Sequence, residues 1–260
     1  MIRALTTAAT GLEAQQANIE RISNDLANVN TDAYKRSHTE FTDLMYQTIK
    51  EPGTQLGSSM QTPVGVQVGM GVKVGSTHKI FEQGPAKVTD HPFDMMINGK
   101  GFLPVQLVNG EVGYTRQGAF HVDSQGRMTQ SNGAQLIPQI TIPTNAIHVS
   151  ISPQGEVKAQ TDTGSENTIG QIQLIGFVNE QGLLAQGDGI YKPSLASGGP
   201  VQALPGENGM GILQQGALEG SNVNVANSMV DMITTQRAYE MGTKVMGVAD
   251  QMLSATVNIK

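Results

Sequence analysis

Two segments at opposite ends of the chain carry an apolar side chain at every seventh residue. Such spacing places side chains along one side of a helix, in a seam that a partner helix covers. We therefore predict helices over residues 2–29 and 222–257 that pair with each other and meet neighbouring copies. The predicted assembly interface consists of Leu5, Leu12, Ile19 and Leu26 in the first segment and Val225, Met232, Tyr239, Met246 and Leu253 in the second.

Small residues accompany the C-terminal repeat, three positions after its apolar members. They permit close approach of a second helix, although a plain packed surface is an alternative interpretation. Asn222 or Asn224 is the expected N-cap of this helix, because asparagine readily accepts a hydrogen bond from the first helical turn. The small residues are Ser228, Thr235, Gly242 and Ala249.

The region between the two predicted helices is rich in strand and turn signals. Over residues 64–75 valine or methionine alternates with glycine, lysine or glutamine, which predicts one strand whose glycines face a closely approaching backbone. Over residues 76–218 turn signals recur every 8–12 residues or so, which indicates an all-β sandwich or barrel-like unit. The expected fold class is α+β: paired terminal helices like a coiled coil, an extended linker and an all-β domain. The expected domains are 1–31 with 221–260, 32–75, and 76–220.

Composition excludes several classes of protein. The net charge is -6 and no basic stripe is visible, so nucleic acid is not an expected partner. The absence of cysteine excludes disulfides and cysteine-based zinc sites. No run approaches the ~18–20 apolar residues of a membrane span. Since the N-terminus also lacks the apolar core of a secretory signal, the protein is either cytoplasmic or exported by a route that reads no cleaved signal.

We find no pattern that predicts catalysis. The five histidines lie at least thirteen residues apart and lack metal-ligand spacing. Asp90 and Asp94 flank a turn, where an acidic pair is usually solvated. No phosphate-binding loop or nucleophile elbow occurs. We expect no catalytic residue, no cofactor and no metal site.

The end of the first predicted helix is the most specific motif in the chain. Residues 23–36, SNDLANVNTDAYKR, resemble the N-terminal signature of the bacterial flagellar rod and hook family, roughly S-N-N-L-A-N-x-x-T-x-G-[FY]-K-R. Two departures are Asp25 for asparagine and Ala33 for glycine; at the second, the turn either does not need a positive φ or tolerates its cost. The matching positions are Asn24, Leu26, Ala27, Asn28, Thr31, Tyr34, Lys35 and Arg36.

Other parts of the chain are similar to the same family. Residues 97–102 and 114–120 resemble its central motifs, and residues 221–225, 232–240 and 250–253 resemble its C-terminal signature. Pro104 departs from the usual continuation of the central motif, which puts the hydrogen bonding of that strand in doubt. The resemblance covers essentially the whole chain.

One segment distinguishes members of this family. Residues 46–63 are similar to the stretch that characterises its distal rod branch. Apolar and proline residues in this segment are expected to dock on neighbouring subunits and make the assembly rigid. They are Tyr46, Ile49, Pro52, Leu56, Met60 and Pro63.

The resemblance implies a structural subunit and not an enzyme. It implies a rigid helical homopolymer of the distal rod that transmits torque and serves as an export channel. The helices would form its inner assembly domain, residues 32–75 would bridge subunits, and the β domain would face outward. Implied partners are proximal rod and hook subunits, the basal-body rings and the flagellar type III export apparatus, from periplasm to outer membrane. Alternatives are a hook or proximal rod subunit, or an exported β-domain enzyme or carbohydrate-binding module, which would need a convergent polar cleft.

Overall fold

The computed structural model describes residues 2–53, 63–161 and 165–258 and divides the chain into two compact units. The first unit comprises residues 1–27, 37–78 and 224–260, and the second comprises residues 28–36 and 79–223. The α+β fold class predicted from the sequence is confirmed, because two terminal helices flank a region made of strands. The three-part domain division remains a prediction.

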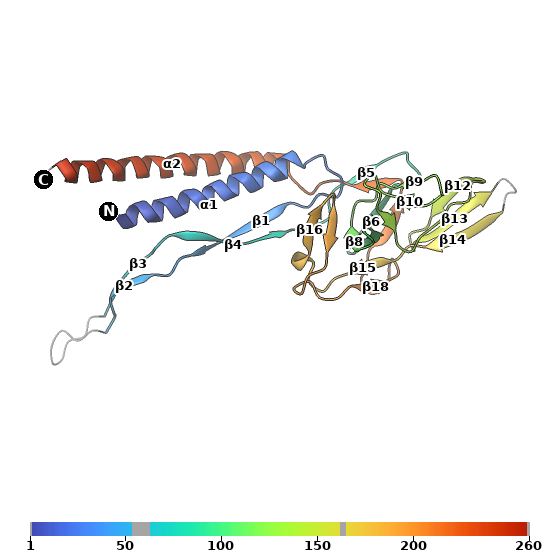
Figure 1. Ribbon diagram of the computed structural model, residues 1–260, viewed down its shortest axis with the longest axis horizontal. Helices are drawn as coiled ribbons and strands as arrows, with labels where there is room; N and C mark the ends of the chain where they lie inside the picture. The colour runs from blue at the N-terminus through green and yellow to red at the C-terminus, as the bar shows by residue number, and fades with distance from the viewer. Residues whose placement is uncertain (1, 54–62, 162–164, 259–260) are drawn as a thin grey trace. The chain divides into compact units, whose positions relative to one another are not determined.

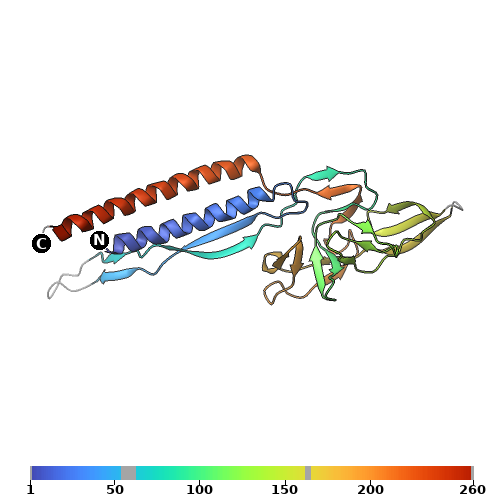
Figure 2. The ribbon, with the colours of Figure 1, turned by 45° about the horizontal axis from the view of Figure 1, so that its top comes forward.

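The first unit contains two long helices, α1 (Ile2–Ala27) and α2 (Val225–Asn258), which run alongside each other (Figures 1 and 2). Their bounds lie within three residues of those expected. Asn224 is the N-cap of α2, since its Oδ1 accepts a hydrogen bond from Asn227 N at 3.1 Å. Neither helix, over the residues described, has the length and apolar content that a bilayer crossing requires.

Two of the small residues of α2, Thr235 and Gly242, contact α1. Thr235 is buried, and its Oγ1 accepts a hydrogen bond from Asn18 Nδ2 at 3.2 Å. A Cβ atom on Gly242 would lie 2.7 Å from Leu12 Cδ2, so only glycine leaves room for this leucine. The close helix approach predicted from the small residues is therefore present, and the contact follows their row.

Two pairs of strands complete the first unit. β1 (Ser37–Asp43) pairs with β4 (Val72–Lys79), whose last residue belongs to the second unit, and β2 (Gln47–Lys50) pairs with β3 (Val66–Val68). The single strand predicted over residues 64–75 is wrong, because Gly69–Gly71 separates β3 from β4 and Gly71 has a φ of 114°. The predicted close backbone approach is confirmed at Gly65, where an added Cβ would lie 2.5 Å from Lys50 O.

Side chains of α1 anchor the helix to the pair formed by β1 and β4. Thr10 Oγ1 accepts a hydrogen bond from Val72 N at 3.4 Å. At the other end of the helix, Asp25 Oδ1 accepts one from Ser37 N at 3.0 Å, and Asp25 Oδ2 pairs with Arg21 Nη1 at 3.1 Å. Asp25, one of the two departures from the family signature, thus fixes the start of β1.

The second unit is built of antiparallel strands in several small sheets. The largest has seven strands in the order β16 (Leu184–Gly187), β17 (Ile190–Lys192), β8 (Val112–Thr115), β7 (Leu103–Gln106), β11 (Gln135–Leu136), β10 (Met128–Thr129) and β9 (His121–Val122). A three-stranded sheet joins β12 (Ala146–Ile151), β13 (Glu156–Thr161) and β14 (Glu166–Gln171). Three pairs remain, β15 (Leu174–Gly176) with β18 (Val201–Ala203), β19 (Ile212–Gln215) with β6 (Met95–Asn98), and β20 (Ala217–Glu219) with β5 (Ala86–Val88). A short 3-10 helix spans Glu180–Gly182.

Two apolar clusters fill the second unit. The larger is mainly aliphatic and contains the fully buried Ile97, Val157 and Leu174. The smaller is aromatic, with Phe102 and Tyr191 packed edge to face at 5.9 Å between ring centroids. Pro104 lies in the middle of β7 without interrupting the sheet, and its carbonyl accepts a hydrogen bond from Ile137 N at 2.9 Å.

Candidate functional site

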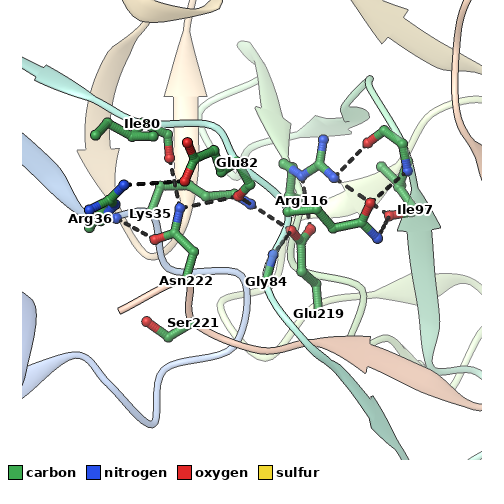
Figure 3. Close-up of polar contacts among 12 residues, drawn as sticks. Lys35, Arg36, Ile80, Glu82, Gly84, Ile97, Arg116, Glu219, Ser221 and Asn222 are labelled. Carbon is green, nitrogen blue, oxygen red and sulfur yellow. Dashed lines mark hydrogen bonds and ion pairs between the residues drawn. The ribbon is translucent and has the colours of Figure 1, made fainter. Parts of the chain in front are cut away.

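Three segments far apart in the sequence meet within the second unit (Figure 3). They are residues 33–36, 80–84 and 219–222. Arg36 N donates a hydrogen bond to Asn222 Oδ1 at 2.7 Å, and Asn222 Nδ2 donates to Ile80 O at 2.9 Å. The two terminal family motifs, which the sequence separates by more than 180 residues, are therefore in direct contact here. We call this region the junction.

A buried cluster of three charged side chains lies at the centre of the junction. Glu219 accepts from Lys35 Nζ at 2.5 Å on one carboxylate oxygen and from Arg116 Nε at 2.8 Å on the other. The side chains of Lys35 and Glu219 are 0% exposed and that of Arg116 is 2% exposed. Gly84 N donates a third hydrogen bond to Glu219 at 3.0 Å. One carboxylate thus holds two cations and a backbone N–H.

Backbone carbonyls stabilise the excess positive charge. Arg116 donates to Gly101 O and Gly99 O, each at 2.9 Å, and Lys35 donates to Glu82 O at 2.7 Å. Burial lowers the pKa of Lys35, an effect that the negative charge of Glu219 opposes. Because the cluster is closed to solvent, it can stabilise a fold but offers no access to a substrate.

The turn before Lys35 resolves an alternative left open by the sequence. Ala33 occupies the position where the family signature has glycine, and its φ is 58°, in the left-handed region. That conformation costs an alanine roughly 1–2 kcal/mol. Ala33 tolerates the cost because it is buried and its N–H donates to Glu219 O at 2.7 Å.

The other motif residues lie around this turn or at the end of α1. Thr31 N donates to Asn28 O at 3.2 Å, which closes the turn after the helix. The Lys79 ammonium lies 4.3 Å from the centroid of the Tyr34 ring, a cation–π contact. Arg36 forms an exposed pair with Glu82 at 3.2 Å. In α1, Asn24 and Ala27 are exposed and Leu26 is half-buried.

The sequence patterns included Arg116 only within the motif at residues 114–120 and did not indicate Glu219. Their pairing spans 103 residues, so no local spacing could reveal it. A signal does exist: Arg116 lies within the family-like motif at residues 114–120, and Glu219 lies two residues before the one at residues 221–225.

A cavity of about 480 Å³ lies in the second unit, lined by Tyr34, Lys79, Gln117, Gln130 and Asp188 among others. Within the described residues, no group of three or more His, Cys, Asp or Glu side chains is arranged to hold a metal ion. In this lining Lys79 Nζ donates a hydrogen bond to the Tyr34 hydroxyl at 3.3 Å.

The predicted assembly interface is divided between a contact inside the first unit and the surface. Seven of its residues are half-buried and two, Val225 and Tyr239, are exposed at 41% and 37%. Their exposure distinguishes these two from the other large residues of the same repeat in α2, which are half-buried. The half-buried seven are Leu5, Leu12, Ile19, Leu26, Met232, Met246 and Leu253.

A second apolar surface on α2 was missed by the search for a seven-residue repeat. Met241, Val245, Val248 and Met252 are 50–62% exposed and follow the i, i+4, i+7, i+11 spacing of one helix face. We call these four residues the α2 stripe. Contiguous exposed apolar side chains of this kind mark interaction surfaces.

The segment expected to confer rigidity is only partly described. Tyr46 and Ile49 are exposed at 55% and 60%, and Pro52 and Pro63 are also exposed. Leu56 and Met60 lie outside the described residues. β2 lies within the segment and pairs with β3, which follows it.

Comparison with known proteins identifies the family. Residues 5–35 match the family described as flagella basal body rod protein, residues 96–159 the flagellar hook protein FlgE/F/G D1 domain, and residues 214–259 the flagellar basal body rod FlgEFG protein C-terminal family. The flagellar basal-body rod protein FlgG of Caulobacter vibrioides is 48% identical over the full length of both chains. The protein of that name from Buchnera aphidicola subsp. Schizaphis graminum is 46% identical over 97% of this chain and 98% of its own, and that from Bacillus subtilis is 32% identical over both full lengths. The chain therefore belongs to the flagellar basal-body rod protein family.

Proposed function

We propose that this chain is the distal rod subunit of the flagellar basal body, a structural protein that self-assembles into a rigid helical tube. The observation that carries the proposal is the α2 stripe, which is apolar, exposed and continuous over three turns of a helix. In water such a surface is unfavourable, and burying it against another copy removes the cost. The full-length similarity to proteins named FlgG supports the rod as the place where this occurs.

The paired terminal helices serve assembly. Their half-buried residues hold α1 against α2, and the exposed Val225, Tyr239 and α2 stripe meet neighbouring subunits. Residues 46–63 add contacts between subunits that permit one packing only, which makes the tube straight and able to transmit torque. The tube serves as an export channel, and the subunit itself leaves the cell through the flagellar type III export apparatus. It meets proximal rod subunits, hook subunits and the surrounding rings between periplasm and outer membrane.

Substitutions on the α2 stripe test this proposal. Val245→Asp introduces a charge into the proposed interface, where its desolvation without a partner costs several kcal/mol. Val245 is 56% exposed but also lines a pocket with Gly11 and Leu12 of α1, so the circular dichroism spectrum of the variant is measured to show that it folds. The matched control is Thr243→Asp, which places the same charge on an exposed part of α2 outside the stripe.

The readout is electron microscopy of basal bodies from strains that carry each variant as the sole copy. We expect short or missing rods and loss of swimming for Val245→Asp, and normal rods for Thr243→Asp. Normal rods in both strains would show that the stripe does not carry assembly.

Deletion of residues 46–63 separates the distal rod from the alternative of a hook or proximal rod subunit. If the segment rigidifies the tube, the deleted chain polymerises through its helices into a curved, more flexible structure. Straight rods indistinguishable from the wild type would mean that the segment does not set rigidity. The absence of any rod would mean that assembly itself depends on it.

A further inference from the structure

Four Asn-Gly pairs occur in the sequence, and one of them differs structurally from the other three. All four asparagines are exposed, so access of water does not distinguish them. The pair matters chemically because glycine has no Cβ to hinder the approach of its backbone nitrogen to the preceding side chain. The pairs are Asn98-Gly99, Asn109-Gly110, Asn132-Gly133 and Asn208-Gly209.

The reaction open to such a pair is spontaneous deamidation. The glycine nitrogen loses its proton and attacks Cγ of the asparagine, a C–N bond forms, and ammonia leaves from the side-chain amide. Water then opens the resulting five-membered imide at either carbonyl, which gives aspartate or isoaspartate. Water is the sole co-reactant, and the rate depends on whether the glycine N–H is free to react.

In three of the pairs the glycine N–H is already engaged. Each donates a hydrogen bond that must break before the nitrogen can turn toward Cγ. The asparagine side chain is also held in two of them, since Asn109 Oδ1 accepts from Glu111 N at 3.1 Å and Asn132 Oδ1 from Ala134 N at 3.0 Å. The glycine bonds are Gly99 N to Gln83 Oε1 at 3.0 Å, Gly110 N to Leu107 O at 2.9 Å and Gly133 N to Gln130 O at 2.9 Å.

The fourth pair lacks both restraints. Over the residues that the structure describes, neither Gly209 N–H nor the Asn208 side chain makes a hydrogen bond. Nothing lies within 4 Å of the position that a Cβ on Gly209 would occupy, so the site is open. The turn is nevertheless ordered on either side, because Glu207 N donates to Leu204 O at 3.1 Å and Met210 N to Glu207 O at 2.8 Å.

We propose that Asn208 is the site at which this folded protein deamidates. The product places a new carboxylate next to Glu207, in the exposed turn between β18 and β19. Where the imide opens to isoaspartate, the backbone gains a methylene group in that turn. The inference does not depend on the proposed function.

Peptide mapping by mass spectrometry tests the proposal on purified full-length protein. The folded protein is incubated in mildly alkaline buffer made with isotopically labelled water, and label uptake is measured at all four asparagines. We expect Asn208 to react at least about fivefold faster than each of the other three asparagines. This is the factor that one intramolecular hydrogen bond contributes to a local equilibrium. Equal rates, or a faster reaction at another pair, would overturn the proposal.

Two further measurements establish that structure is the cause. In urea the hydrogen bonds are lost, so the four deamidation rates are expected to converge. If Asn208 still reacted faster by the same factor, the difference would be due to the neighbouring sequence and would contradict the proposal. Gln83→Ala removes the acceptor of Gly99 N–H and is expected to accelerate the reaction at Asn98 alone. No acceleration, in a variant with the wild-type circular dichroism spectrum, would also contradict it.

Discussion

Glu219→Gln removes the only anion of the buried cluster while keeping the size of the side chain. The glutamine leaves Lys35 and Arg116 as two buried cations without a counter-charge, and its amide group turns one acceptor into a donor that faces Arg116 Nε or Lys35 Nζ. Breaking a buried ion pair by removing one partner costs about 3–5 kcal/mol. That is a large part of the 5–15 kcal/mol or so that stabilises a typical domain.

The assay is thermal and urea unfolding of the full-length protein, followed by circular dichroism in the region of the β signal. For a domain of this size each kcal/mol shifts the midpoint by about 2–4 °C, so the expected loss is roughly 6–20 °C. The loss is expected to persist at high salt, because buried charges are screened little. Lys35→Met in the Glu219→Gln background removes one unpaired cation and should restore part of the stability.

Glu156→Gln is the matched control, since Glu156 forms an exposed pair with Lys158 at 3.7 Å in the same unit. That change is expected to alter the free energy of unfolding by less than about 0.5 kcal/mol. If Glu219→Gln were no more destabilising than Glu156→Gln, the cluster would not hold the junction together.

Two other predictions concern the helix pair and alkaline pH. Gly242→Leu drives a side chain into Leu12 and should destabilise the helix pair by about 1–3 kcal/mol. Gly247→Leu should instead increase helix stability, because nothing lies within 4 Å of the position that a Cβ would occupy there. Limited proteolysis of α2 measures both effects, and equal protection of the two variants would refute the contact between Gly242 and Leu12. Burial raises the pKa of Tyr191 to about 12, above the usual value near 10, so the unfolded chain releases this proton first and stability falls as pH rises through that window. Urea unfolding at about pH 9 and about pH 11 should show the wild type losing about 1.4 kcal/mol more than Tyr191→Phe between the two pH values, and parallel losses would refute the assignment.

The sequence predicted the elements that depend on local patterns. Both long helices follow from apolar periodicity, and the small residues near Thr235 and Gly242 indicated where the helices approach each other. The heptad of large residues was less informative, because Val225 and Tyr239 are exposed. Periodicity detects a helix face, but which face is covered depends on steric fit with the partner.

Contacts between distant residues could not be predicted in this way. The carboxylate of Glu219 meets Lys35 across 184 residues of sequence, and no spacing rule connects them. Ala33 shows the same limitation: the sequence allowed either backbone conformation, and the hydrogen bond to Glu219 O determines which one occurs. The strand break at Gly69–Gly71 was missed because alternating valines continue through it, although Gly71 has a left-handed φ.

The proposed rod requires that copies of this chain join through α2. Site-directed disulfide crosslinking tests it directly, because the chain has no native cysteine and any crosslink comes from introduced residues. Each variant carries Val248→Cys and one further cysteine at an exposed position of α1 or α2. Isolated basal bodies that contain the variant are oxidised, and the crosslinked chains are examined by electrophoresis without reductant. Ladders of crosslinked copies are expected for some stripe pairings, and none are expected with Thr243→Cys in place of Val248→Cys. Monomers only, in basal bodies that contain complete rods, would contradict it.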